Sequence, residues 1–242
     1  MILLVHGDRE YVRAPGEELQ TDLGVLTVPD DPEPGTVLET HLGEEFVVRR
    51  LRGPDLFNHL DRTGAPMMPR DIGLVIGFTG AQAGDRVLDA GTGTGILSAY
   101  LGRLGAAVTT YEIDAEFAEN ARQNMETAGV ADAVSVRTGN VLDDLDRLRE
   151  EPPFDLVTLD TGDAPDMVEH VPDLLVPGGY VAVYSPFVES TRSVVEAARD
   201  AGLADVRTLE TIQREMTFDD RGSRPSTRGV GHTGYLTIAR NE

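Results

Sequence analysis

The sequence predicts an α/β fold in which a mostly parallel, doubly wound sheet follows a small N-terminal β-domain. From about residue 70 onwards, short apolar segments alternate with amphipathic segments, which is typical of strands joined by helices. Before residue 65, short apolar segments are instead separated by turns rich in proline and glycine. We therefore assign residues 1–65 to the small β-domain and residues 66–242 to the α/β domain.

The N-terminal region contains four short segments that we expect to form strands. Pro15-Gly16 and Pro34-Gly35 separate them, because proline and glycine favour the backbone angles of tight turns. The expected strands cover residues 11–12, 24–28, 36–38 and 45–48, and residues 56–69 are expected to connect the two domains.

The α/β region is expected to alternate strands and helices in a regular order. Asp114 should cap one helix at its N-terminus, and Phe117, Ala118, Ala121 and Met125 should form the buried face of that helix. Ligands of such folds bind beyond the carboxyl ends of the strands. The expected strands cover residues 86–89, 107–112, 134–137, 154–160, 180–185, 206–214 and 233–240, and the other main helices cover residues 96–104 and 188–201.

The composition is strongly acidic. The chain has 242 residues, with 42 acidic and 21 basic side chains and a net charge of −21, and every basic residue is arginine. Such a surface repels itself at low salt, whereas about 1 M salt shortens the screening length to roughly 3 Å. We infer a halophilic, haloarchaeal cytoplasm. The alternative is a merely acidic soluble protein encoded by a GC-rich genome.

Other compositional features narrow the class of protein. The chain has no cysteine, which excludes disulfides and thiolate metal sites, and its other candidate ligands lack the spacing of a metal site. The N-terminus lacks the features of a signal peptide, and no apolar run approaches the ~20 residues that span a bilayer. We expect a cytoplasmic protein without a membrane partner or a metal.

A glycine-rich loop, Asp89-Ala90-Gly91-Thr92-Gly93-Thr94-Gly95, joins the first α/β strand to its helix. Its G-x-G-x-G spacing differs from the dinucleotide fingerprint. Glu112 ends the next strand, where a carboxylate can accept both ribose hydroxyls of a nucleoside cofactor. Asn140 follows the third strand and could bond an adenine edge. The loop alone could be a tight turn, but its order with Glu112 and Asn140 favours a nucleoside cofactor.

These motifs resemble known enzymes. The segment VLDAGTGTGILS, followed by YEIDAEFAENARQN, is similar to the Rossmann-like class I methyltransferases, which use S-adenosyl-L-methionine. More narrowly, the chain resembles the tRNA adenine-N1 methyltransferases that act on T-loop adenines 57 and 58. The matching segments are Pro69-Arg70-Asp71, Tyr111-Glu112, Leu159-Asp160, Val183-Tyr184-Ser185-Pro186 and the ending Gly231-His232-Thr233-Gly234-Tyr235-Leu236.

The resemblance implies roles for particular residues. Asp160 would accept a hydrogen bond from the exocyclic amino group of the target adenine and so activate N1, and Tyr184 would border that base. The family also implies a tRNA partner and a homotetramer. The residues implied to bind S-adenosyl-L-methionine are Asp89, Gly91, Thr92, Gly93, Thr94, Gly95, Glu112, Asn140 and Asp160.

Further side chains have two interpretations. Arg70 and Asp71 lie where the family places cofactor-pocket residues, or they form a helix cap. His232 is more often structural than functional in such a position. Two arginine sets could follow a phosphate backbone or be ordinary solvated side chains: Arg49, Arg50 and Arg52, and Arg221, Arg224 and Arg228 in an expected polar loop at 219–231.

The chain departs from the family around the target base. It has Met68-Pro69 where the family often has Tyr-Pro, Thr161 to Pro165 in place of a Trp-bearing segment, and Glu189-Ser190 in place of Glu-Gln. These changes concern the acceptor more than the methyl donor. The alternatives are a methyltransferase of another acceptor, such as protein isoaspartate, and a non-catalytic tRNA-binding subunit on the same fold.

Overall fold

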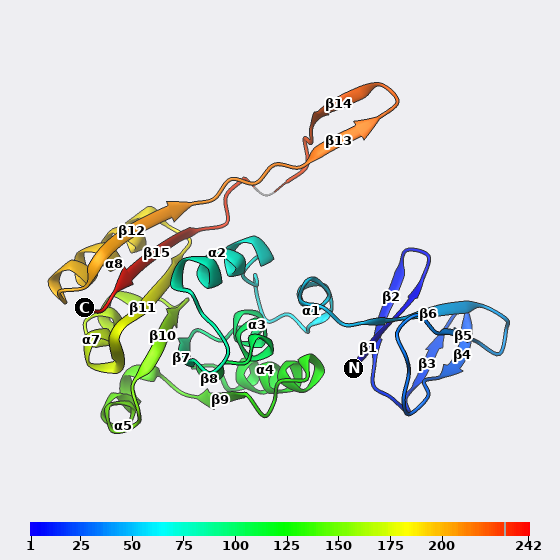
Figure 1. The fold of residues 1–242 in the computed structure, drawn as a ribbon, viewed down its shortest axis with the longest axis horizontal. Helices are drawn as coiled ribbons and strands as arrows, with labels where there is room; N and C mark the ends of the chain where they lie inside the picture. Colours follow the sequence, from blue (N-terminus) through cyan, green and yellow to red (C-terminus); the bar gives the residue numbers. More distant parts are fainter. Residues whose placement is uncertain (230) are drawn as a thin grey trace.

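The N-terminal region forms two small antiparallel sheets. The computed structural model describes residues 1–229 and 231–242. One sheet has the strand order β2-β1-β6-β5, and the other is the hairpin β3-β4, with Leu4, Leu26 and Phe46 buried between them (Figure 1). The strands are β1 (Ile2–His6), β2 (Arg9–Arg13), β3 (Glu18–Thr21), β4 (Gly24–Thr27), β5 (Val37–Glu39) and β6 (Glu45–Arg50).

Two strands of this region were not predicted. β1 packs Ile2 and Leu4 into one apolar core and Leu3 and Val5 into another, so both of its faces are buried and it shows no polar alternation. β3 carries polar side chains at most positions, and only Leu19 is buried. Neither segment shows the alternating pattern of a half-buried strand.

The α/β region is built on a seven-stranded sheet with the order β12-β15-β11-β10-β7-β8-β9. The strands from β11 to β9 pair in parallel, whereas β15 pairs antiparallel with both β11 and β12. The mostly parallel sheet expected from the sequence is therefore confirmed. The strands are β7 (Arg86–Ala90), β8 (Ala107–Glu112), β9 (Val134–Thr138), β10 (Phe154–Leu159), β11 (Leu175–Ser185), β12 (Ala204–Glu210) and β15 (Tyr235–Arg240).

Helices cover both faces of this sheet, because successive strand residues point to opposite sides. Val87 belongs to the apolar core beneath α2, α3 and α4, whereas Leu88 belongs to the core beneath α5 to α8. No helix in the described residues is both long and apolar enough to cross a membrane. The helices are α1 (Gly53–His59), α2 (Pro69–Thr79), α3 (Ile96–Leu104), α4 (Ala115–Ala128), α5 (Leu145–Glu150), α6 (Ala164–Val168), α7 (Val171–Leu174) and α8 (Val188–Asp200), with a short 3-10 helix at Val141–Asp144.

The segment expected to be a polar loop at 219–231 is partly a hairpin. Strands β13 (Met216–Asp219) and β14 (Gly222–Pro225) pair antiparallel and extend away from the sheet (Figure 1). The expected loop also includes Val230, which lies outside the described residues. The hairpin buries almost none of its side chains, so no apolar periodicity marks it in the sequence.

Four other expectations are corrected. β12 ends at Glu210 and not at residue 214, and β15 begins at Tyr235, two residues later than expected. The segment expected to connect the domains contains α1 and the start of α2. Phe117 is 38% exposed and leaves the buried face of α4, whereas Asp114 caps that helix by accepting the amide hydrogens of Glu116 and Phe117.

Candidate active site

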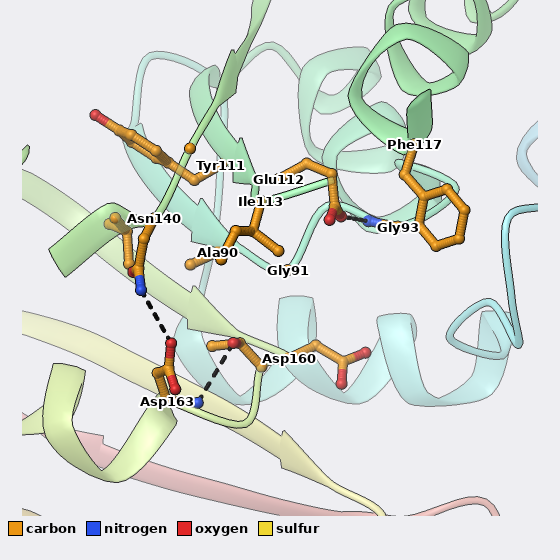
Figure 2. A pocket seen from close by; sticks show the side chains of 13 residues that line it. Ala90, Gly91, Gly93, Tyr111, Glu112, Ile113, Phe117, Asn140, Asp160 and Asp163 are labelled. Carbon is orange, nitrogen blue, oxygen red and sulfur yellow. Dashed lines mark hydrogen bonds between the residues drawn. The ribbon is translucent and has the colours of Figure 1, made fainter. Parts of the chain in front are cut away.

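A cavity of about 300 Å³, here called the loop cavity, opens at the carboxyl ends of β7, β8 and β10 (Figure 2). Connections leave this edge towards opposite faces of the sheet, and such a switch point is where α/β folds bind ligands. Its lining residues are Ala90, Gly91, Gly93, Tyr111, Glu112, Ile113, Phe117, Gly139, Asn140, Val141, Asp160, Thr161 and Asp163.

The glycine loop forms one wall of this cavity, and its glycines differ in purpose. Gly91 has a φ of +91°, and a Cβ atom there would overlap the carbonyl oxygen of Asp160. Gly93 has a φ of +50°, and the nearest described atom to its Cβ position, the hydroxyl oxygen of Thr63, lies 4.0 Å away. Gly95 lines neither this cavity nor its neighbour, because its side faces Met125, 2.6 Å from where a Cβ would lie. Gly91 and Gly93 thus shape the ligand side of the loop, and Gly95 lets α4 pack against it.

The two threonines of the loop point away from the loop cavity. The hydroxyl of Thr92 lies 2.6 Å from that of Thr110 inside the fold, and the hydroxyl of Thr94 accepts the amide of Thr63 at 3.5 Å. Both residues line a smaller cavity of about 50 Å³ on the other side of the loop. Thr92 and Thr94 therefore hold the loop in place, and a direct contact with a cofactor stays a prediction.

Asp89 is buried beneath the loop. Its carboxylate accepts hydrogen bonds from the hydroxyls of Ser98, Thr110 and Thr158 at 2.8, 2.7 and 2.6 Å. Burial raises the pKa of Asp89, while these three hydroxyls lower it. The side chain joins β7, β8, β10 and α3 directly under the glycine loop, so its geometry is that of a support for the loop.

Glu112 ends β8 with its carboxylate facing the loop. One carboxylate oxygen accepts the amide of Gly93 at 2.8 Å, and the other accepts the amide of Asp114 at 3.1 Å (Figure 2). A carboxylate oxygen can accept more than one hydrogen bond, so Glu112 keeps acceptor capacity towards the cavity. The strand-end position expected from the sequence is confirmed.

Asn140 holds a second acidic side chain of the loop cavity. Its amide nitrogen donates to the carboxylate of Asp163 at 3.1 Å, while its carbonyl oxygen accepts the amide of Leu142 at 3.0 Å (Figure 2). Asn140 lines the cavity as expected, but both ends of its amide already have protein partners. Asp163 was not identified from the sequence, because it approaches Asn140 only through the turn that follows β10.

Asp160 follows β10 and lines three cavities: the loop cavity, the smaller cavity beside the glycine loop, and a third one. The side chain of Asp160 is exposed to solvent through these openings, although many protein atoms lie around its carboxyl group. This partial desolvation, aided by the charge of Asp89, raises the pKa of Asp160 to about 7. The residue is thus poised to change its protonation state near neutral pH.

The third cavity, here called the β11 cavity, measures about 290 Å³ and lies beyond the end of β11. Asp160 and Tyr184 both line it, so the two proposed catalytic side chains meet in one place. The other lining residues are Thr161, Gly162, Ala164, Pro165, Ser185, Pro186, Phe187, Ser190 and Val194. Ser190 belongs to a segment that the resemblance places around the target base, whereas Phe187 was not identified from the sequence, since only the tertiary fold brings the start of α8 beside Asp160.

Tyr184 is held by groups from two distant segments. Its hydroxyl donates to the carboxylate of the buried Asp71 at 3.3 Å, and burial raises the pKa of Tyr184 to about 12. The Thr233 hydroxyl donates to the same carboxylate at 3.0 Å. Gly234 lies against the ring, because a Cβ atom there would be 2.6 Å from the ring carbon Cζ. The ending Thr233-Gly234 therefore shapes the β11 cavity through Tyr184.

Arg70 and Asp71 line neither the loop cavity nor the smaller cavity beside it. They lie in the first turn of α2, where Arg70 donates to Thr233 at 2.9 Å and pairs with Asp71 at 3.6 Å. The two cavities give the expectation of a cofactor-pocket position no support, and it stays a prediction. The alternative of a helix cap is wrong, because α2 has no side-chain capping hydrogen bond and these residues anchor Tyr184 and Thr233.

The remaining candidates lie outside the cavities. His232 is held by Glu210 at 3.0 Å and by the carbonyl of Pro186 at 3.1 Å, and these acceptors raise its pKa. The two arginine sets are exposed, on β6 and after it, and on or near the β13–β14 hairpin. Among the described residues, no three His, Asp or Glu side chains are grouped as a metal site would require.

Sequence comparisons assign this chain to a known family. Residues 53–222 match the family described as tRNA methyltransferase complex GCD14 subunit. The chain belongs to this family. The TrmI tRNA (adenine(57)-N(1)/adenine(58)-N(1))-methyltransferase of Methanocaldococcus jannaschii is 33% identical over 97% of this chain and 92% of its own length. Similarity to the GCD14 family therefore extends beyond the matched segment to nearly the whole chain.

Solved structures confirm the fold of this GCD14-family chain. A SAM-dependent O-methyltransferase from Thermotoga maritima superposes with a TM-score of 0.80 at 24% identity, over 99% of this chain and 92% of that one. TrmI from Aquifex aeolicus, a tRNA (m1A58) methyltransferase, superposes with a TM-score of 0.74 at 23% identity, over 99% and 95%. The α/β region thus has the Rossmann-like methyltransferase fold expected from the sequence.

Proposed function

We propose that this protein transfers a methyl group from S-adenosyl-L-methionine to N1 of adenine 57, adenine 58 or both in the T-loop of tRNA. One observation carries the proposal: Asp160 lines both the loop cavity and the β11 cavity, which measure about 300 and 290 Å³. A donor in the first cavity and an acceptor in the second would meet at this carboxylate. Membership of the GCD14 family and the similarity to TrmI supply the identity of the two substrates.

The loop cavity fits S-adenosyl-L-methionine in size and in chemistry. Gly93 presents backbone where no side chain intrudes, and Glu112 offers acceptor oxygens for ribose hydroxyls. Asp163, held by Asn140, offers a carboxylate to the adenine amino group, with Ile113 and Phe117 as exposed apolar surface for the ring. When bound, this cofactor supplies a methyl group on a sulfonium that is already activated.

The acceptor side requires a group that makes adenine N1 more nucleophilic. The carboxylate of Asp160 would accept a hydrogen bond from the exocyclic amino group and stabilise the positive charge that develops on the base. Tyr184, whose hydroxyl is held by Asp71, would form a fixed wall for the base. The protein thereby acts mainly by positioning the two reactants.

The proposal is tested with radiolabelled methyl donor and unmodified tRNA at molar salt, followed by nucleoside analysis. The expected product is N1-methyladenosine. Transfer to protein and not to tRNA would favour an isoaspartate-type methyltransferase instead. Cofactor and tRNA binding without any transfer would make this chain a non-catalytic subunit, the alternative that the family's description as a complex subunit keeps relevant.

The same proposal covers domain organisation, cellular location and assembly. The chain divides between residues 65 and 66 into a small β-domain and the methyltransferase domain. It works in a halophilic, haloarchaeal cytoplasm and forms a homotetramer. The exposed side chains of Ile212, Met216 and Phe218 on and beside the β13–β14 hairpin supply apolar surface for a subunit contact. Arg221 and Arg224 on the same hairpin are candidates for contacts with phosphates.

A further inference from the structure

Phe187 is an exposed aromatic side chain at the wall of the β11 cavity. It is 66% exposed, and it lines that cavity together with Asp160 and Tyr184. Among the described residues, no other aromatic ring or guanidinium group stacks on it. A large apolar surface is therefore left in water beside the carboxylate at which the two substrates meet.

The side chain of Phe187 does not cap the N-terminus of the helix that follows it. Phe187 is the N-cap residue of α8, and its side chain makes no capping hydrogen bond. Serine, threonine, aspartate and asparagine are favoured at this position because their oxygens accept the free amide hydrogens of the first turn. The stability of α8 would thus be better served by a small polar residue.

The backbone around Phe187 is nevertheless firmly held. Its carbonyl oxygen accepts hydrogen bonds from the amide and the hydroxyl of Thr191 at 3.0 and 2.8 Å. The carbonyl oxygen of the preceding residue, Pro186, accepts a hydrogen bond from the ring nitrogen Nε2 of His232 at 3.1 Å. The ring consequently projects from a fixed point on the cavity wall, where no described aromatic or guanidinium group stacks on it.

We propose that the ring of Phe187 stacks on the target adenine when that base occupies the β11 cavity. This inference rests on the proposed function, because a T-loop adenine must leave its stack before Asp160 can reach it. An exposed aromatic face replaces part of the lost stacking and tolerates any orientation of the sugar and phosphate. Phe187 would then bind the acceptor, while Asp160 activates it.

Fluorescence provides a direct test, because the chain contains no tryptophan. In Phe187→Trp, unmodified tRNA with S-adenosylhomocysteine should quench the single indole by stacking. Val188→Trp is the matched control, since Val188 is 57% exposed but does not line the cavity. A transcript with an abasic site in place of the target adenine should leave Phe187→Trp unquenched. Equal quenching with the intact and abasic transcripts would overturn the proposal.

Kinetics and stability give a second, independent readout. Phe187→Ala should raise the KM for tRNA about tenfold, as expected for the loss of one base–aromatic stack, while cofactor affinity and the behaviour of Val188→Ala stay as in the wild type. Phe187→Ser should raise the same KM and also raise the melting temperature by capping α8. A wild-type KM in Phe187→Ala would overturn the proposal.

The outcomes separate this inference from the function on which it rests. If the wild-type protein forms no N1-methyladenosine, the proposed function fails. If the wild type forms it and Phe187→Ala does so with unchanged KM, the function stands and only the stacking role fails. Melting curves of all variants show whether each one is folded.

Discussion

At the scale of single residues, the acidic side chains of the site differ in how many protein partners their oxygens have. The carboxylate of Asp89 accepts hydrogen bonds from three hydroxyls, whereas Asp160 lines three cavities. The two acids lie at the end of neighbouring strands and differ only in these surroundings. The first is consequently a support for the glycine loop, and the second is available for chemistry.

Replacement of Asp160 tests its role directly. Asp160→Asn should lower kcat for tRNA methylation by about a hundredfold or more, because an amide neither carries the charge nor enriches N1 as a carboxylate does. The dissociation constant for S-adenosyl-L-methionine should change little. Asp166→Asn, at an exposed position on α6 outside the cavities, is the control. Near-normal turnover in Asp160→Asn would contradict the assignment.

The pKa of Asp160 predicts the pH dependence of the wild-type reaction. The group must be ionised to act, and its pKa is raised to about 7, so kcat/KM should fall as the pH decreases through about 7. The same shift affects stability. Ionisation of Asp160 is less favourable in the folded state than in the unfolded state, so this residue lowers the free energy of unfolding as the pH rises from about 4 to 7. A fall in kcat/KM centred at the ordinary carboxyl pKa of about 4 would contradict the predicted shift.

Gly234 offers a steric test of Tyr184. Gly234→Ala should displace the ring, because the new Cβ atom would lie 2.6 Å from the ring carbon Cζ, and kcat/KM for tRNA should fall about tenfold. Gly231→Ala is the matched control, since no atom of the other described residues lies within 4 Å of its Cβ position. Cofactor affinity should stay unchanged in both variants, and a wild-type kcat/KM in Gly234→Ala would refute the role given to Tyr184.

At the scale of elements, the sequence predicted those segments whose burial leaves a pattern. The strands from β7 to β11 read as short apolar runs, and Glu112 and Asp160 follow from the positions at which two of them end. Strand β1 was missed because apolar cores bury both of its faces, and the β13–β14 hairpin because it is almost wholly exposed. Asp163 and Phe187 could not be predicted, since only the turn after β10 and the packing of α8 bring them to the cavities.

The glycine loop supplies a prediction at this scale. Gly91→Ala should destabilise the fold by more than about 3 kcal/mol, because it adds a backbone clash with Asp160 to the strain of a positive φ. Gly84→Ala is the matched control: its φ of +93° nearly equals the +91° of Gly91, but nothing lies within 4 Å. The control should cost only about 1–2 kcal/mol. Urea unfolding measures both, and equal losses would refute the clash.

At the scale of the whole molecule, charge and solvent act together. The chain has 42 acidic side chains but only 21 arginines and no lysine, which gives a net charge of −21. The melting temperature should therefore rise steeply as sodium chloride increases towards about 1 M, where the screening length is roughly 3 Å. Choline chloride at equal ionic strength controls for effects specific to the sodium ion. A melting temperature independent of salt below 1 M would argue against adaptation to a halophilic cytoplasm.

The close contact between Gly91 and the carbonyl of Asp160 has a consequence for how such an enzyme can change its acceptor. The backbone at Asp160 packs directly against the glycine loop, so a displacement of one requires a displacement of the other. Variation that alters the acceptor while preserving methyl transfer is thereby directed to the opposite wall, formed by the end of β11 and the start of α8. A library that redirects this enzyme to a new base should leave the loop untouched and randomise that wall.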